Sequence, residues 1–252
     1  MSRASTHRAA ARVRFAAART RRAVAGAALG AGLALGLAAL APNAAAAELN
    51  DDLRVSYTSW RLGVDGVRQE STHAERLHRR PGAIWIAREI PPAVERLHDT
   101  HRHAHNGPGH SHAEVAGAPL WIRRDVGGAL DVRLVDAHER RLIRIDPPHY
   151  GNVGFSGDWM EARHLVDPAL LSKLQAVGEP VDGVQRYQTT RGHRTIRIRW
   201  DVAGRFAREI DVRDDRGLGG QSVRAEPIPA PQPSPFEQTE GYRDRDYSDL
   251  LD

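Results

Sequence analysis

The sequence predicts a mainly β protein with one short helix, folded as an antiparallel meander that forms an open or half-closed barrel. Between residues 53 and 212, short runs of alternating apolar and polar residues are separated by turn residues. This alternation is typical of antiparallel strands that bury one face. Helical periodicity is nearly absent from the same stretch. Together the runs predict roughly eight or nine strands, arranged as an open sheet with a small helical element.

Turn and proline signals divide the first half of the chain into strands. A strand at 55–60 leads to the hairpin-type turn Asp65-Gly66, and a polar run follows to the break at Pro81-Gly82. The prolines Pro91-Pro92 and Pro147-Pro148 each end a strand, because proline cannot donate a backbone hydrogen bond to a sheet ladder. The predicted strands bounded in this way are 83–90, 120–123, 130–135 and 140–146.

The second half contains the predicted helix and the clearest hairpin. Asp167 is a good helix cap with Pro168 at the first position, and leucines continue one side until Gly178 ends the helix. Strands at 184–190 and 194–200 flank a turn at Arg191-Gly192, and a last strand spans 206–212. In the 194–200 strand, alternation predicts that Ile196, Ile198 and Trp200 are buried and that Arg197 and Arg199 face water.

The net positive charge of the chain comes from its first 47 residues. The whole sequence has 36 Lys and Arg against 32 Asp and Glu; the first 47 residues hold seven Arg and no acid, which leaves 29 basic residues against 32 acidic ones. The remainder is therefore slightly acidic. Binding to nucleic acid needs a basic excess on the folded part, so a nucleic-acid partner is disfavoured.

Residues 1–47 have the pattern of an export signal. An Arg-rich start is followed by an apolar stretch at 23–41, and Ala45, Ala46 and Ala47 form a small-residue cleavage site before Glu48. We expect cleavage after Ala47 and a periplasmic protein with no transmembrane anchor. The alternative is an uncleaved anchor, because 19 apolar residues approach the length of a membrane span. Export without cysteine excludes disulfides and thiolate metal sites.

Three regions follow from these patterns: a signal peptide at 1–47, a β-rich domain at 48–226, and a Pro-rich linker with an acidic tail at 227–252. Prolines stand at every second position from Pro227 to Pro235, which favours an extended linker. The tail beyond it is acidic with a few aromatic and leucine anchors. It is interpreted either as a solvated tail or as a docking peptide that adds to a protein partner or to its own sheet.

A His-rich insertion at 94–117 carries the one concentrated chemical signal. Six of the 13 histidines of the chain lie within 15 residues: His98, His101, His103, His105, His110 and His112. Imidazole is a common ligand of Zn, Cu and Ni, and a segment bearing several can close around one ion. These six histidines are the predicted metal site. The alternative is a polar insertion without a metal-dependent role.

No enzyme motif emerges. His98-Asp99-Thr100-His101 lacks the spacing and the glutamate of the metalloprotease helix, and Ser156 lacks the context of a nucleophile elbow. The absence of cysteine and the single lysine remove thiol and Schiff-base chemistry. We therefore predict a protein without catalytic or cofactor-binding residues, with an uncharacterised hydrolase as the least supported alternative.

The pattern of strands resembles the periplasmic half-barrel superfamily, which includes lipoprotein carriers and the envelope-stress regulator that senses lipoproteins. The similar pieces are hairpins at 67–90 and 130–146 and the strand-turn-strand WDVAGRFAREI at 200–210. This chain has Phe206-Ala207 where members carry proline, and the His segment is an insertion. No binding residue is carried over.

The resemblance implies a curved sheet around a helical plug that holds acyl chains, with Trp60, Trp85, Trp121, Trp159 and Trp200 as cavity lining. We therefore expect an exported carrier or sensor of a lipid or lipoprotein ligand. The alternative is a periplasmic protein that binds divalent metal through the His-rich segment.

Overall fold

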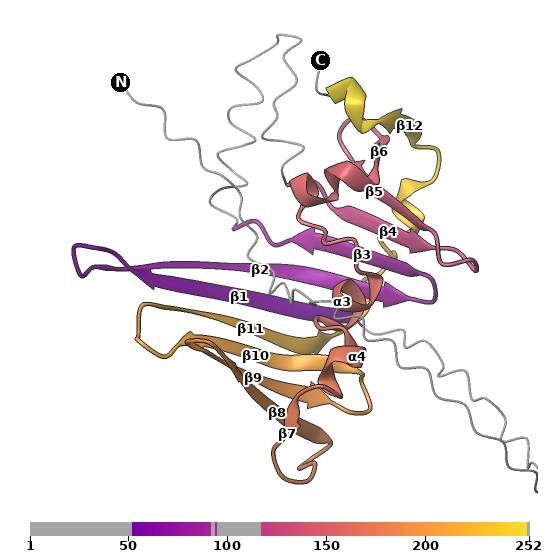
Figure 1. Cartoon of the computed structure of the whole chain (residues 1–252). Helices are drawn as coiled ribbons and strands as arrows, with labels where there is room; N and C mark the ends of the chain where they lie inside the picture. The colour runs from indigo at the N-terminus through magenta and orange to yellow at the C-terminus, as the bar shows by residue number, and fades with distance from the viewer. Residues whose placement is uncertain (1–51, 92–93, 95–116, 251–252) are drawn as a thin grey trace, which may run out of the picture.

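The computed structural model describes residues 52–91, 94 and 117–250. They form one 12-stranded sheet whose strand order is β12-β6-β5-β4-β3-β2-β1-β11-β10-β9-β8-β7 (Figure 1). All pairs are antiparallel except β12 with β6. The edge strands β12 and β7 stand at opposite ends of this order, so the sheet is not closed into a barrel. The predicted mainly β, antiparallel and open architecture is confirmed.

Most elements follow one another with short connections, whereas residues 89–119 separate β3 from β4. In chain order they are β1 Asp52–Leu62, β2 Arg68–Arg80, β3 Ala83–Arg88, β4 Leu120–Arg124, β5 Leu130–Asp136, β6 Arg141–Ile145, η1 Pro147–Val153, α3 Trp159–His164, α4 Pro168–Leu171, β7 Gln175–Ala176, β8 Val184–Arg191, β9 Arg194–Asp201, β10 Phe206–Asp214, β11 Gly219–Ile228, η2 Glu237–Thr239, β12 Arg243–Asp246 and η3 Tyr247–Leu250.

The predicted turn residues make the tight connections. Gly66 between β1 and β2 has φ 76°, and Gly82 between β2 and β3 has φ 65°. Glycine adopts these left-handed values without the steric cost that a side chain brings. In the β8–β9 hairpin, Arg191 pairs with Arg194, so the turn is Gly192-His193 rather than the predicted Arg191-Gly192. Gly192, with φ 58°, supplies the backbone that a two-residue hairpin turn requires.

The helical part differs from the prediction of one short helix. α4 begins as predicted, with the Asp167 side chain accepting from the Ala169 N–H, but it ends at Leu171, and Gln175–Ala176 is already a strand. A second helix, α3, precedes it. Its six residues are too few for a periodic pattern, although the Asp158 side chain caps the backbone N–H groups of Met160 and Glu161.

The C-terminal region contributes two strands that alternation alone did not predict. β11 continues to Ile228, and Pro227 pairs with Leu53 in the next-to-last step of the β1–β11 ladder. β12 lies parallel to β6, with Arg243 opposite Arg141. Of the two interpretations of the tail, addition to its own sheet therefore describes residues 243–246, while Pro227 belongs to the sheet rather than to a linker.

The main core lies between one face of the sheet and the helices α3 and α4 (Figure 1). We call this the helix face, and the opposite one the outer face. Leu53, Val55 and Tyr57 show the period-2 alternation of β1 toward the helix face. The prediction for β9 is confirmed: Ile196, Ile198 and Trp200 are buried, whereas Arg197 and Arg199 are exposed.

Candidate binding site on the helix face

An apolar cavity lies between α3 and the centre of the sheet. Its walls come from five strands and from α3 with its following residue: Tyr57, Glu75, Leu77, Ile86, Glu161, Ala162, Leu165, Ile210 and Val223. The volume open to the centre of a water molecule is about 30 Å³. That is enough for a water molecule but far below the several hundred Å³ of typical ligand pockets. With α3 in this position, the cavity is a narrow seam too small for an acyl chain.

α3 closes the cavity as a short, separately capped plug. The Asp158 carboxylate accepts hydrogen bonds from Met160 N at 2.8 Å and Glu161 N at 3.0 Å. Left-handed residues flank the helix, with Gly157 at φ 84° before it and Leu165 at φ 67° after it. A non-glycine residue such as Leu165 adopts that conformation at a cost, so the position of α3 is maintained by packing and not by its backbone preference.

His164, the last residue of α3, joins the helix to the far part of the sheet. Its Nδ1 contacts the carbonyl oxygen of Arg205, and its ring lies 6.2 Å from that of Trp200. Burial lowers the pKa of His164 to about 4, and the nearby arginines Arg163, Arg79 and Arg205 act in the same direction. The imidazole is therefore neutral near pH 7, and because a carbonyl can only accept, Nδ1 carries the proton.

A stacked aromatic pair marks the end of the cavity. Tyr57 and His73 face each other across the β1–β2 ladder, with ring centroids 4.8 Å apart and planes 12° from parallel. The His73 Nε2 lies 4.0 Å from the Glu75 carboxylate, which is on the cavity wall. Beyond this pair, the next residues on the same face are Ser59 and Ser71, then Arg61 and Gln69.

These last four residues belong to the lining of a second, larger depression. It is lined by Ser59, Trp60, Arg61, Gln69, Glu70, Ser71, Arg194, Val212, Asp214, Leu218, Gly219, Gly220 and Gln221, and its volume open to the centre of a water molecule is about 630 Å³. We call it the groove. Most of its side chains are polar, in contrast to the cavity under α3. The helix face therefore presents an apolar part and a polar part along the same strands.

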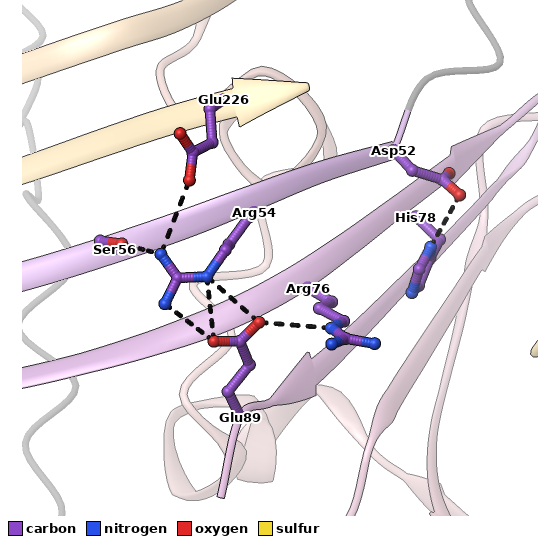
Figure 2. Close-up of polar contacts among 7 residues, drawn as sticks. All are labelled: Asp52, Arg54, Ser56, Arg76, His78, Glu89 and Glu226. Atoms are coloured by element: carbon purple, nitrogen blue, oxygen red, sulfur yellow. Dashed lines mark hydrogen bonds and ion pairs between the residues drawn. The ribbon is translucent and has the colours of Figure 1, made fainter. Parts of the chain in front are cut away.

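The outer face of the same strands is occupied by ion pairs. Figure 2 shows the Arg54 guanidinium between two carboxylates, with Glu89 Oε2 at 2.9 Å and Glu226 Oε1 at 3.6 Å. Arg76 contacts the other Glu89 oxygen at 3.3 Å. The hydrogen bond from Arg54 is the main reason that the pKa of Glu89 lies below its ordinary value. Partly exposed charges that pair with one another are typical of a solvated protein surface and not of a ligand site.

At the edge of that network, Asp52 is buried with two basic partners. His78 Nδ1 lies 2.9 Å and Arg80 Nη1 2.6 Å from the carboxylate oxygens (the His78 contact is drawn in Figure 2). Burial by itself raises the pKa of Asp52, but the hydrogen bonds from Arg80 and His78 outweigh it and keep that pKa below its ordinary value. The pair ties the start of β1 to the end of β2.

The tryptophans do not line the cavity under α3, contrary to the expectation. Trp159 and Trp200 belong to the main core, and Trp60 lines the groove. Trp85 and Trp121 are on the outer face, where Phe236 of the C-terminal region packs against both, with centroids at 5.9 and 6.3 Å. The tryptophans of the strands pack into hydrophobic clusters on both faces of the sheet. Alternation along the sequence cannot distinguish such packing from cavity lining.

The predicted metal ligands His98, His101, His103, His105, His110 and His112 lie outside the described residues, as do residues 1–47. Within the described part of the chain, no group of three or more His, Cys, Asp or Glu is placed to hold a metal ion. In that same part, no helix is long and apolar enough to cross a membrane. Ser156, which lacks the sequence context of a nucleophile elbow, donates a hydrogen bond from its hydroxyl to the Glu161 carboxylate at 2.8 Å.

Neither family models nor curated proteins match this sequence. Three solved structures are similar in fold. PNGF-II is 9% identical with TM-score 0.33, over 80% of this chain and 32% of its own, so this chain spans about a third of it. An outer membrane lipoprotein-sorting protein domain from Vibrio parahaemolyticus is 12% identical with TM-score 0.30, over 74% and 89%. A LolA superfamily protein from Nitrosomonas europaea is 11% identical with TM-score 0.27, over 70% and 84%.

The names of the last two are those of the lipoprotein-carrier group that the sequence resembles, but at TM-scores of 0.30 and 0.27 no property of those proteins transfers to this chain. At this identity the likeness concerns the fold alone. Sequence reasoning did not single out the lining of the two depressions. Glu161 and Ala162 belong to the unpredicted α3 and Gly219 to the unpredicted β11, and the lining residues on predicted strands meet only through the strand order. The Asp158-x-x-Glu161 spacing was the available signal for α3.

Proposed function

We propose that this protein is an exported, non-enzymatic carrier or sensor that binds the acyl chain of a lipid or lipoprotein on the helix face of its sheet. The observation that supports this most is the apolar seam under α3, which continues along the same strands into an open polar groove. An amphipathic ligand has the same two parts. Apolar side chains with few polar groups are the usual lining of a small-molecule site.

Acyl binding requires α3 to move, because the seam is too small as it stands. The helix has one and a half turns, so its stability comes from packing and from the Asp158 cap. Gly157 and Leu165, with left-handed backbone conformations, flank the helix at its two ends and are the positions where the chain can hinge. Displacement of α3 would uncover Leu77, Ile86, Ile210 and Val223 for an acyl chain, whose burial replaces the contacts that the helix gives up.

A non-enzymatic role agrees with the chemistry of the described residues. Ser156 hydrogen-bonds a carboxylate, and the Asp52–His78 pair is buried against Arg80 on the outer face. The Asp52–His78 pair is on the face opposite the cavity, and the sequence around Ser156 carries no nucleophile-elbow motif. Export and a periplasmic location are part of the proposal and rest on the pattern of residues 1–47.

The chain has no cysteine, so a single introduced thiol can report the position of α3. Ala162 is 6% exposed on α3, whereas Ala169 on α4 is exposed and does not line the cavity. In an Ala162→Cys variant, dodecanoate should increase the rate of thiol alkylation several-fold. An Ala169→Cys variant should react quickly with and without dodecanoate. Native mass spectrometry of the purified wild type should show acyl adducts.

If calorimetry detects no binding of dodecanoate and no adduct is present, the carrier proposal fails. If dodecanoate binds while the Ala162→Cys thiol stays protected, the ligand binds elsewhere, and the proposed displacement of α3 is wrong.

A second candidate function is divalent metal binding by the His-rich segment. The observation that favours it is the concentration of six histidines in 15 residues. Because the described residues hold no group of three metal-binding side chains, we propose that any tight site for Zn, Cu or Ni is formed by His98 to His112.

A further inference from the structure

The charges around the groove are unevenly paired. Four charged residues belong to its lining: Arg61, Arg194 and Asp214 on the helix face, and Glu70, whose side chain is on the outer face by alternation. Both carboxylates are bound by arginines outside the lining, Glu70 by Arg68 at 2.5 Å and Asp214 by Arg216 at 3.0 Å. The hydrogen bond from Arg216 lowers the pKa of Asp214 to about 2. Both carboxylates of the lining are therefore already paired with an arginine.

The two lining arginines have no such partner. Arg61 donates from Nε to the neutral amide oxygen of Gln69 at 2.9 Å. Arg194 stands directly opposite Asp214 in the β9–β10 ladder, yet that carboxylate is bound by Arg216 instead. Among the described residues, no carboxylate lies within ion-pair distance of Arg61 or Arg194. In the groove, Arg216 offsets Asp214, so Arg61 and Arg194 leave an excess of two positive charges.

The cavity under α3 has the opposite character. Its lining includes two carboxylates, Glu75 and Glu161, and no basic residue, so an anionic group is disfavoured there. Tyr57 is at the cavity and Arg61 at the groove on the same strand and face, four residues or about 13 Å apart. An acyl chain lying along β1 from the cavity would bring its head group to the arginines.

We propose that the ligand of the helix face is an acyl compound with an anionic head, carboxylate or phosphate, which Arg61 and Arg194 bind in the groove while the acyl chain lies under α3. This deepens the carrier function proposed above and rests on it. Guanidinium groups suit both head groups, because their donors match the oxygens of carboxylate and phosphate. Ser59, Ser71 and Gln221 supply neutral donors beside them.

The test measures binding of four probes to the full chain by calorimetry at low ionic strength: dodecanoate, lauroyl lysophosphatidylglycerol, neutral dodecyl maltoside and cationic dodecyltrimethylammonium, all below their micelle concentrations. The wild type should bind the anionic probes at least tenfold more tightly than the neutral one, and the cationic one most weakly. The ratio of the affinity for dodecanoate to the affinity for the lysophospholipid distinguishes a carboxylate ligand from a phosphate ligand.

An Arg61→Gln, Arg194→Gln double variant should lose about tenfold in anion affinity per arginine, the factor that corresponds to about 1.4 kcal/mol for a charge-assisted hydrogen bond. Its affinity for dodecyl maltoside should not change. The matched control is Arg197→Gln, Arg199→Gln, which removes the same charge from exposed positions on the outer face. That control should bind all four probes as the wild type does.

Equal losses in both double variants would reduce the effect to net charge and overturn the proposal, as would equal affinity of the wild type for neutral and anionic probes. Both results would leave acyl binding itself intact. If none of the four probes binds, the carrier function fails first, and the head-group proposal falls with it.

Discussion

His164 of α3 donates its Nδ1 proton to the carbonyl oxygen of Arg205, in the turn between β9 and β10. This contact fastens the end of the plug to the sheet, and it requires a neutral imidazole. Burial lowers the pKa of His164 to about 4 from an ordinary value of 6.5. Between these two values, the unfolded chain binds a proton that the folded chain does not.

The first prediction follows from that difference. The free energy of unfolding should fall as the pH falls from about 6.5 to about 4, by up to about 3 kcal/mol from this group, and should be unaffected by it above pH 6.5. In a His164→Gln variant, which can still donate to the Arg205 carbonyl, denaturant titrations should show a shallower pH dependence over this window. Identical slopes in the two proteins would mean that His164 titrates normally.

The second prediction concerns the two faces of β9. Ile198 is 1% exposed and pairs with Ile210, whereas Arg197 is exposed on the outer face opposite Asp211. Ile198→Asp should destabilise by several kcal/mol, because it buries a charge without a partner. Arg197→Asp should cost about 1 kcal/mol or less, from repulsion by Asp211. Urea denaturation measures both, and similar losses would contradict the assignment of faces.

The third prediction links the cap of α3 to ligand binding. Asp158→Ala removes the side chain that binds Met160 N and Glu161 N, and should cost about 1 kcal/mol of stability. Because α3 is then easier to displace, dodecanoate should bind more tightly to this variant. Asp167→Ala removes the cap of α4 and should lower stability without raising affinity. A gain in affinity in both variants would point to general loosening instead of a plug.

The fourth prediction addresses the His-rich segment. Replacement of residues 94–117 by a short glycine-containing turn should leave thermal stability nearly unchanged, because β3 and β4 on either side are paired with each other. The same replacement should abolish tight Zn or Cu binding. In the intact chain, metal should be released below about pH 6, since imidazole must be neutral to coordinate. Calorimetry that finds equal metal affinity in both proteins would place the site elsewhere.

The fifth prediction concerns export. The secreted form should begin at Glu48, because Ala45 and Ala47 fit the small-residue rule for signal cleavage. N-terminal sequencing of protein from the periplasm measures this directly. A chain that keeps Met1 and sediments with membranes would support the uncleaved anchor instead.

The positions and faces of most strands were predictable from the sequence, because they depend on local alternation. Ile196, Ile198 and Trp200 in β9 are an example: side chains two residues apart share a face whatever the partner strand is. The turns at Gly66 and Gly82 were predictable for a similar reason, since glycine is the residue that adopts positive φ without a steric penalty.

The tertiary structure alone decided the order of the strands and the shape of the site. Alternation specifies a face but not a neighbour, so nothing local places β11 between β1 and β10, or β12 parallel to β6. The six residues of α3 are too few to show a period, and they become a helix through the Asp158 cap and burial against the sheet. Arg61 and Arg194, which are 133 positions apart in the numbering, share the groove only because β11 and β10 pair in succession between β1 and β9.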